Sequence, residues 1–125
     1  MSYIWLLVAL GGCAGAMSRY AVIQFMSARF STAFPYGTLT VNILGSFTLG
    51  LLLGSQWDAE HKHYFAVLGI GYLGSFTTFS TYAVEGLQMV QKKRWRSFIL
   101  YQLTSYGLSI GAATVGFLCG RSMNS

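Results

Sequence analysis

The sequence predicts an all-α membrane protein that forms a single four-helix transmembrane domain over residues 1–125. Charged residues make up only 9% of the chain, against about 25% in an ordinary soluble domain. Hydrophobic residues reach 54%, and the mean hydropathy is +0.51. Each of four charge-free stretches approaches or exceeds the ~20 residues that a helix needs to cross a bilayer. These stretches are residues 1–18, 30–57, 64–84 and 97–120.

The same composition excludes several classes of protein. So few charged side chains cannot cover the surface of a small soluble enzyme, and no pattern suggests covalent catalysis. Cys13 and Cys119 are too few for a disulfide scaffold, and we interpret them as small buried apolar residues. The net charge is +5, but the basic residues do not line one polar face, so we expect no nucleic-acid partner. We expect His61 and His63 to be solvated in a polar link.

Four helices are expected rather than a β-barrel, because the apolar runs do not alternate with polar residues. A signal peptide is the rival interpretation of residues 1–18, but a basic start is lacking. The links are short, which makes consecutive helices antiparallel neighbours. The predicted spans lie near residues 3–24, 37–57, 64–91 and 97–120, joined by links at 25–36, 58–63 and 92–96.

Lysine and arginine counts address the orientation of these spans. The first and third links share one side of the membrane and carry Arg29, Lys92, Lys93, Arg94 and Arg96. The other side carries Lys62 and Arg121. This bias predicts that the third link is cytoplasmic. Two charged residues, Arg19 and Glu85, fall inside predicted spans.

Glycine is unusually frequent, with 15 residues in the chain. Glycines four residues apart let helix backbones approach closely in lipid. We favour a tight oligomer, and the alternative is packing within one four-helix bundle. The spaced pairs are Gly11/Gly15, Gly50/Gly54, Gly107/Gly111 and Gly116/Gly120.

Polar side chains share faces on two of the spans. Thr38, Asn42 and Gly45 lie on one face of the second span, because their spacings are four and three. A buried amide such as that of Asn42 must pair across helices or face a wet path. Tyr101, Ser105 and Ser109 form a hydroxyl stripe down the fourth span, although such serines often bond their own backbone.

The third span contains poor helix-forming sequence at its middle, from Gly74 through Thr77 and Thr78 to Tyr82. We therefore expect the third helix to break near mid-membrane. Such a break survives only where it is buried in protein or lines a cavity, and its freed carbonyls suit a small cation. Phe79 and Tyr82 are three residues apart and present two rings on one face.

These motifs resemble the Fluc/CrcB family of fluoride channels over nearly the whole chain. Gly11-Gly12 through Gly15-Ala16 to Arg19-Tyr20 resembles the family's first-span motif. Pro35-Tyr36-Gly37-Thr38-Leu39 with Asn42 and Gly45 resembles its second. Gly74 followed by Thr77-Thr78-Phe79-Ser80-Thr81, with Glu85 beyond, resembles its third-span signature.

The resemblance implies a passive, fluoride-selective channel of the bacterial plasma membrane that exports fluoride from the cytoplasm. It implies an antiparallel, dual-topology homodimer with two pores at the subunit interface and a structural sodium ion. The sodium would be held by backbone carbonyls of Gly74 and Thr77 from both subunits, and Arg19 and Glu85 are structural charges. The implied pore-lining residues are Asn42, Phe79, Tyr82, Thr38, Ser80 and Thr81, with Tyr101, Ser105 and Ser109 as a polar track.

Three features depart from the family pattern. Tyr82 stands where the family usually has Phe, and its phenol adds a donor expected to hold the anion longer. Ser75 stands where a second glycine is usual. Dual-topology members have nearly balanced charges, so the Lys/Arg bias leaves open a separate partner subunit of opposite orientation.

Fluoride chemistry suits these side chains. The ion is strongly hydrated, so hydroxyls, an amide N–H and the positive edges of aromatic rings must replace its water. Ring edges attract an anion without trapping it, as conduction requires. Two other functions stay open: a small multidrug-type exporter, although the first span carries Arg19 and no coupling acid, and a non-transporting scaffold, which leaves Asn42 and Thr77 unexplained.

Overall fold

The computed structural model describes residues 3–30, 34–56 and 61–123, and within those ranges it contains helices and no strand. Three helices are continuous: α1 (Tyr3–Arg29), α2 (Tyr36–Gly54) and α7 (Trp95–Met123). Each of the three is long and apolar enough to cross a membrane. The predicted all-α membrane fold is therefore confirmed, and the protein is a multi-pass membrane protein.

The third predicted span is divided. It consists of α4 (Lys62–Phe65), the π-helix η1 (Ala66–Leu73), α5 (Gly74–Phe76) and α6 (Ser80–Gln91). The predicted end of the second span at residue 57 and residues 58–60 of the following link lie outside the described residues. Helix α1 continues to Arg29, beyond its predicted end near residue 24, because no glycine or proline interrupts it there.

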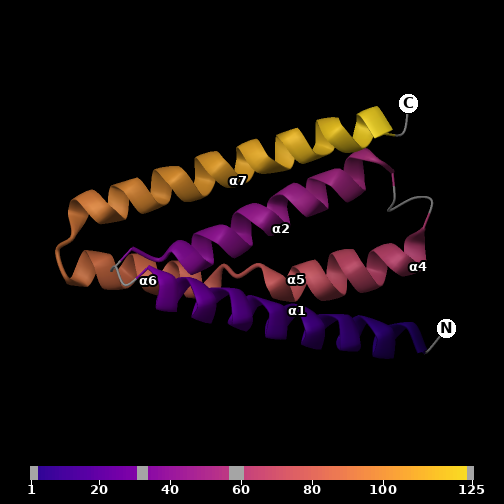
Figure 1. Ribbon diagram of the computed structural model, residues 1–125, viewed down its shortest axis with the longest axis horizontal. Coiled ribbons are helices and arrows are strands. Elements are labelled where there is room, and N and C mark those ends of the chain that lie inside the picture. The colour runs from indigo at the N-terminus through magenta and orange to yellow at the C-terminus, as the bar shows by residue number, and fades with distance from the viewer. Residues whose placement is uncertain (1–2, 31–33, 57–60, 124–125) are drawn as a thin grey trace.

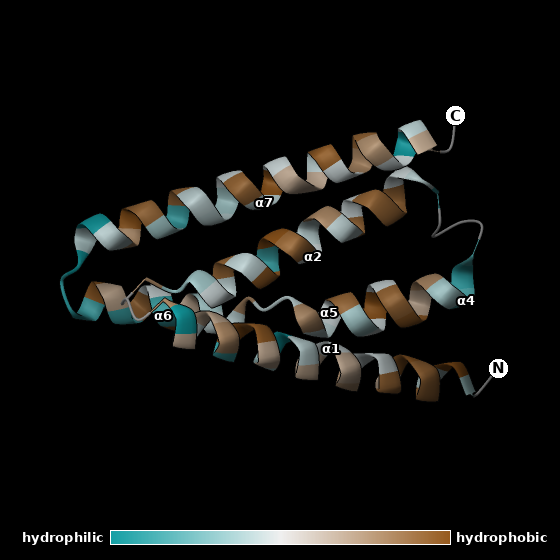
Figure 2. Ribbon diagram, viewed as in Figure 1, coloured by the Kyte–Doolittle hydropathy of each residue, from teal (hydrophilic) through white to brown (hydrophobic). Residues whose placement is uncertain are grey.

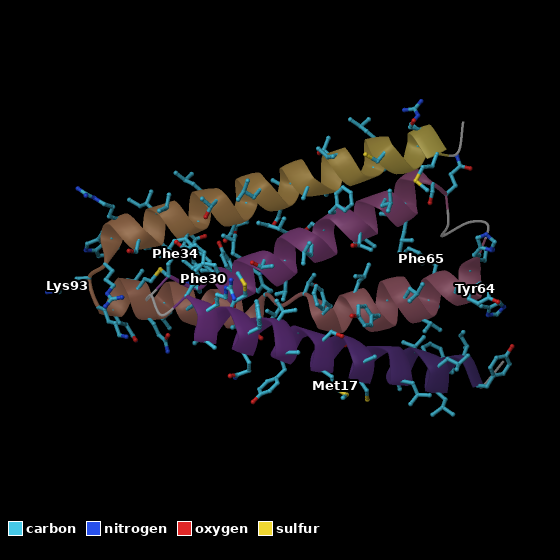
Figure 3. All side chains as sticks on the ribbon, viewed as in Figure 1. Met17, Phe30, Phe34, Tyr64, Phe65 and Lys93 are labelled. Carbon is cyan, nitrogen blue, oxygen red and sulfur yellow. The ribbon has the colours of Figure 1, made fainter. Side chains whose placement is uncertain are left out.

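The helices form an antiparallel bundle in which the described chain begins and ends at the same end (Figure 1). Helix α7 packs along α2, and α1 packs along η1 and α5. Hydrophilic residues gather at the ends of the helices, for example at the start of α4 and between α6 and α7 (Figure 2). Apolar side chains such as that of Met17, which is 72% exposed, point away from the bundle (Figure 3), as expected of a surface that faces lipid.

Glycines set the distance between α2 and α7. A Cβ atom placed on Gly50 or Gly54 would overlap backbone of Ala113 or Phe117 on α7. A Cβ on Gly116 would overlap the Phe47 carbonyl in return. Both backbones therefore interlock, as small residues permit in lipid.

Helix α1 approaches the third span in the same way. A Cβ on Gly11 would lie 2.6 Å from the Val67 carbonyl oxygen, and one on Gly71 would lie 2.7 Å from that of Val8. The Tyr72 hydroxyl donates to Ser18 Oγ at 2.7 Å. These contacts hold the half of the third span that precedes its non-helical residues.

The turn between α6 and α7 closes with a Schellman motif. The Arg94 amide donates to the Met89 carbonyl at 2.9 Å, and the Lys93 amide donates to that of Val90 at 3.1 Å. Lys93 takes the left-handed conformation that glycine usually supplies, with φ of 57°. This short turn keeps α6 and α7 adjacent.

An aromatic cluster packs between α6 and α7. Tyr82 and Tyr101 are buried with ring centroids 5.1 Å apart. Phe34 packs edge-on against Tyr101 with centroids 5.5 Å apart. Figure 3 shows Phe30 and Phe34 together at the end of the bundle where Lys93 lies. The cluster joins the start of α2 to α6 and α7.

Candidate functional site

The candidate site is built around three non-helical residues, 77–79, in the third span. Helix α5 ends at Phe76, Thr77 is extended with φ −80° and ψ 158°, and α6 begins at Ser80. The local sequence explains the interruption, because β-branched and hydroxyl residues are weak helix formers that favour side-chain bonds to backbone.

Asn42 clamps this interruption from α2. Its Nδ2 donates to the Thr78 carbonyl at 3.1 Å, and the Thr78 amide donates to its Oδ1 at 2.9 Å. Both backbone polar groups of Thr78 are thus satisfied by one side chain, which removes the cost of leaving them unpaired in an apolar medium. An amide group has two N–H donors, so the clamp leaves Asn42 with a second one.

The clamp changes the bonding of Gly74. In an unbroken α-helix the Gly74 carbonyl would accept from the Thr78 amide, four residues on. That amide donates instead to Asn42. The Gly74 carbonyl therefore loses its helical donor.

The same holds for Thr77. Its helical donor would be the amide of Thr81, which donates instead to Thr78 Oγ1 at 3.2 Å. The Thr77 side chain bonds back to the Leu73 carbonyl at 3.0 Å and not toward α6. The carbonyls of Gly74 and Thr77, which the family resemblance implies as cation ligands, are thus among those that lose their helical donors at the interruption.

Beside the interruption lies a cavity of about 360 Å³. It brings together seven residues predicted for the site: Asn42, Gly74, Thr77, Phe79, Tyr82, Ser105 and Ser109. The rest of its lining is Gly45, Ser46, Leu49, Gly69, Leu73, Thr78 and Tyr106. Residues from α2, from both halves of the third span and from α7 therefore converge on one space.

Two aromatic rings form part of the cavity wall. Phe79 and Tyr82 lie with ring centroids 5.7 Å apart and planes tilted by 48°. Phe79 is 73% exposed, whereas Tyr82 is 7% exposed. The Tyr82 hydroxyl donates to Oε1 of Gln102 on α7, a residue that does not line the cavity. Because Phe79 lines the cavity and is largely exposed, the cavity is open to the outside of the bundle at this residue.

Ser105 supplies the most telling polar atom of this wall. The residue is 8% exposed, and its hydroxyl has no hydrogen-bond partner among the described residues. A buried hydroxyl without a partner costs free energy that a ligand would recover.

A second cavity, of about 280 Å³, lies nearer the end of the bundle. Glu85, Lys92 and Arg94 are among its lining residues. Tyr101 is fully buried and donates to Glu85 Oε1 at 3.1 Å. Tyr101 therefore links the cavity at Glu85 to the helix face that carries Ser105 and Ser109.

The remaining predicted site residues lie away from the first cavity. Thr38 is buried on α2. Ser80 is exposed, and the Thr81 hydroxyl accepts from that of Thr78 at 3.1 Å. Arg19 is half-buried on α1. Thr78 Oγ1 also accepts from the Thr81 amide in the first turn of α6, at 3.2 Å.

Sequence analysis missed three residues of this region. Ser46 lies one turn after Asn42 and shares its face, so helical spacing could have found it. Tyr106 and Gln102 share a face of α7 with Ser105 and Ser109, at spacings of three and four. The partner of Gln102 lies 20 residues earlier in the sequence, which no local pattern indicates.

A family model described as "CrcB-like protein, Camphor Resistance (CrcB)" matches residues 6–117. This chain belongs to the CrcB family. The matched range contains every CrcB-like motif named above and all residues that line the first cavity. The resemblance inferred from the sequence is therefore confirmed.

Curated relatives of this CrcB protein cover nearly all of it. "Fluoride-specific ion channel FluC 1" of Geobacillus kaustophilus (strain HTA426) is 44% identical over 119 residues, which are 95% of this chain and 99% of the relative. "Fluoride-specific ion channel FluC" of Magnetococcus marinus is 42% identical over 97% of this chain and 98% of the relative. The protein of the same name from Vibrio parahaemolyticus is 42% identical over 88% of each.

Proposed function

We propose that this chain conducts fluoride passively across the bacterial plasma membrane and so exports it from the cytoplasm. The observation that carries the proposal is the buried, unpartnered Ser105 hydroxyl in a cavity that Phe79 and Tyr82 also line. Hydroxyl hydrogens and ring edges are both positive, so this wall suits a small anion. The relatives are named as fluoride-specific ion channels, which agrees with that chemistry.

The fluoride path runs along the hydroxyl stripe of α7. Ser105 and Ser109 line the first cavity, and the second N–H of Asn42 is available beside them. Tyr101 of this stripe donates to Glu85 of the second cavity. In that cavity Lys92 and Arg94 attract anions from solution. Neither basic residue lines the first cavity, so no basic side chain there would trap fluoride by direct contact.

Two copies of the chain in opposite orientations form the channel. Phe79 is 73% exposed although it lines the cavity, so the wall is incomplete on that side. Gly74 is exposed, and a Cβ on it would meet only the Gly69 carbonyl, at 3.9 Å. A second copy that packs here would close the cavity and explain the glycine.

The carbonyls of Gly74 and Thr77 would hold a sodium ion where the two copies meet. The residues fit this cation, because both carbonyls have lost their helical donors to Asn42 and Thr78. Carbonyl oxygens are hard ligands suited to such an ion. The bound sodium would supply a buried positive charge that offsets the cost of removing water from fluoride.

The test of conduction uses purified protein in liposomes loaded with potassium fluoride. A potassium ionophore clamps the voltage, and a fluoride electrode follows efflux. We expect rapid fluoride efflux, no comparable chloride efflux and no requirement for a proton gradient. Equal chloride efflux, or strict dependence on a proton gradient, would reject the proposal.

The test of assembly introduces one cysteine, Lys93→Cys, into a variant in which Cys13 and Cys119 are replaced by serine. Intact cells are then labelled from outside. Labelling of about half the chains, as equal populations of two orientations require, supports the antiparallel homodimer. Protection of every chain, with conduction that depends on a second gene product, would instead show a heterodimer of opposite subunits.

A further inference from the structure

Tyr82 poses a chemical problem for the proposed path, because a phenol carries both a weakly attractive ring edge and a strong O–H donor. A free O–H beside fluoride would form a short, charge-assisted hydrogen bond. Such a bond would hold the ion and slow its release, whereas conduction requires weak sites.

The structure places the two parts of this phenol differently. The residue lines the cavity with Phe79, with ring centroids 5.7 Å apart. Its hydroxyl donates to Gln102 Oε1, outside the cavity lining. The rings of Tyr101 and Tyr106 pack on Tyr82 with centroids 5.1 Å and 6.0 Å away, which fixes its plane.

The side chain of Gln102 packs against α6 at Gly86. Its Nε2 lies where a Cβ on Gly86 would be only 3.3 Å away. Gly86 follows Tyr82 by one helical turn, so both lie on the same face of α6. The glycine therefore leaves room for the amide, whose Oε1 then meets the Tyr82 hydroxyl.

We propose that Gln102 is a positioning residue that occupies the Tyr82 hydroxyl proton, so that Tyr82 offers fluoride its ring edge and no O–H donor. Gln102 thereby tunes how long the ion stays, and it does so without touching the path. This inference rests on the proposed fluoride conduction. It assigns a specificity-determining role to a residue that the chain's motifs do not include.

The test is a double-mutant cycle in the same liposome assay, with efflux measured against fluoride concentration. Four proteins are compared: the unaltered chain, Gln102→Leu, Tyr82→Phe and the double variant. With Tyr82 present, we expect Gln102→Leu to lower both maximal efflux and the half-saturating fluoride concentration by about three- to tenfold, the value of one hydrogen bond. In the Tyr82→Phe background, Gln102→Leu should have no further effect.

The controls separate positioning from packing. Gln24→Leu makes the same substitution on an exposed part of α1 and should leave efflux unchanged. If Gln102→Leu slows efflux equally in both backgrounds, its role is packing and the inference is overturned. Absence of any effect beside Tyr82 also overturns it. Failure of the unaltered chain to conduct fluoride would reject the proposed function itself, which is a separate outcome.

Discussion

The glycines between α2 and α7 differ from Gly74 in what fills the space beside them. A Cβ on Gly54 would overlap the Phe117 carbonyl, and one on Gly116 would overlap that of Phe47. A Cβ on Gly74 would meet only one atom within 4 Å, at 3.9 Å. Closed glycines are explained by the chain's own fold. The open glycine beside the freed Thr77 carbonyl points to something outside one chain.

Not every open glycine has this meaning. Gly107 and Gly111 on α7 also have nothing within 4 Å of an added Cβ. Each follows Ser105 or Ser109 by two residues, which places it about 200° around the helix from the hydroxyl stripe. These two glycines therefore face away from the cavity and lie on the lipid side. The comparison thus separates three kinds of glycine: those that allow close packing within the chain, Gly74, to which we assign a role in assembly, and those that serve neither purpose.

The largest effect is expected at a closed glycine. Gly54→Val would force apart α2 and α7 at the Phe117 carbonyl, at a cost of about 1–3 kcal/mol or more. We expect little folded protein after extraction, measured by size-exclusion profile and thermal unfolding. Gly107→Val is the matched control on open surface. A monodisperse Gly54→Val protein with unchanged thermal stability would break the comparison.

Gly74→Val should separate assembly from folding. The chain has room for the new side chain, so helicity measured by circular dichroism should be kept. We expect loss of dimerisation and of fluoride efflux, because the branched side chain would occupy the surface on which we propose that a second copy packs. Cross-linking in membranes measures the dimer directly. A variant that stays dimeric would show that the second copy does not pack on Gly74.

Like the glycines, the side chains that line the cavity should differ in whether their substitution affects the fold as well as fluoride efflux. Asn42→Asp removes the donor to the Thr78 carbonyl and places a negative charge before an anion, so both thermal stability and efflux should fall. Phe79 is exposed and forms no such clamp. Phe79→Ile should abolish efflux through loss of the ring edge, with little change in thermal stability. Near-normal efflux in either folded variant would remove that residue from the path.

The smallest effect is expected on the lipid side. Gly107→Ala should raise helix stability by about 1 kcal/mol, the difference in helix propensity. Efflux should be unchanged, because the new methyl group meets no atom of the chain. Thermal unfolding and the liposome assay measure both quantities on one preparation. Lost dimerisation would reassign Gly107 to the assembly surface.

Much of this molecule could be predicted from local sequence patterns. The low charge content predicts the membrane fold, and helical spacing places Ser105 and Ser109 on one face. The weak helix formers from Thr77 onward indicate where α5 ends. Long-range side-chain bonds could not be predicted, because Asn42 meets Thr78 across 36 residues and Tyr82 meets Gln102 across 20. The π-helical form of Ala66–Leu73 has no local sequence signal either.

The Asn42 clamp also sets an order of events during biosynthesis. As the third span enters the bilayer, the amide and carbonyl of Thr78 would be exposed to lipid unless a partner is already there. That partner belongs to α2, which leaves the ribosome earlier. The second span must therefore already be inserted in the membrane, next to the third span, when Thr78 enters the bilayer. If the second and third spans were inserted at separate places in the membrane, the amide and carbonyl of Thr78 would lack their partner Asn42, and the interrupted third span would be unstable in lipid.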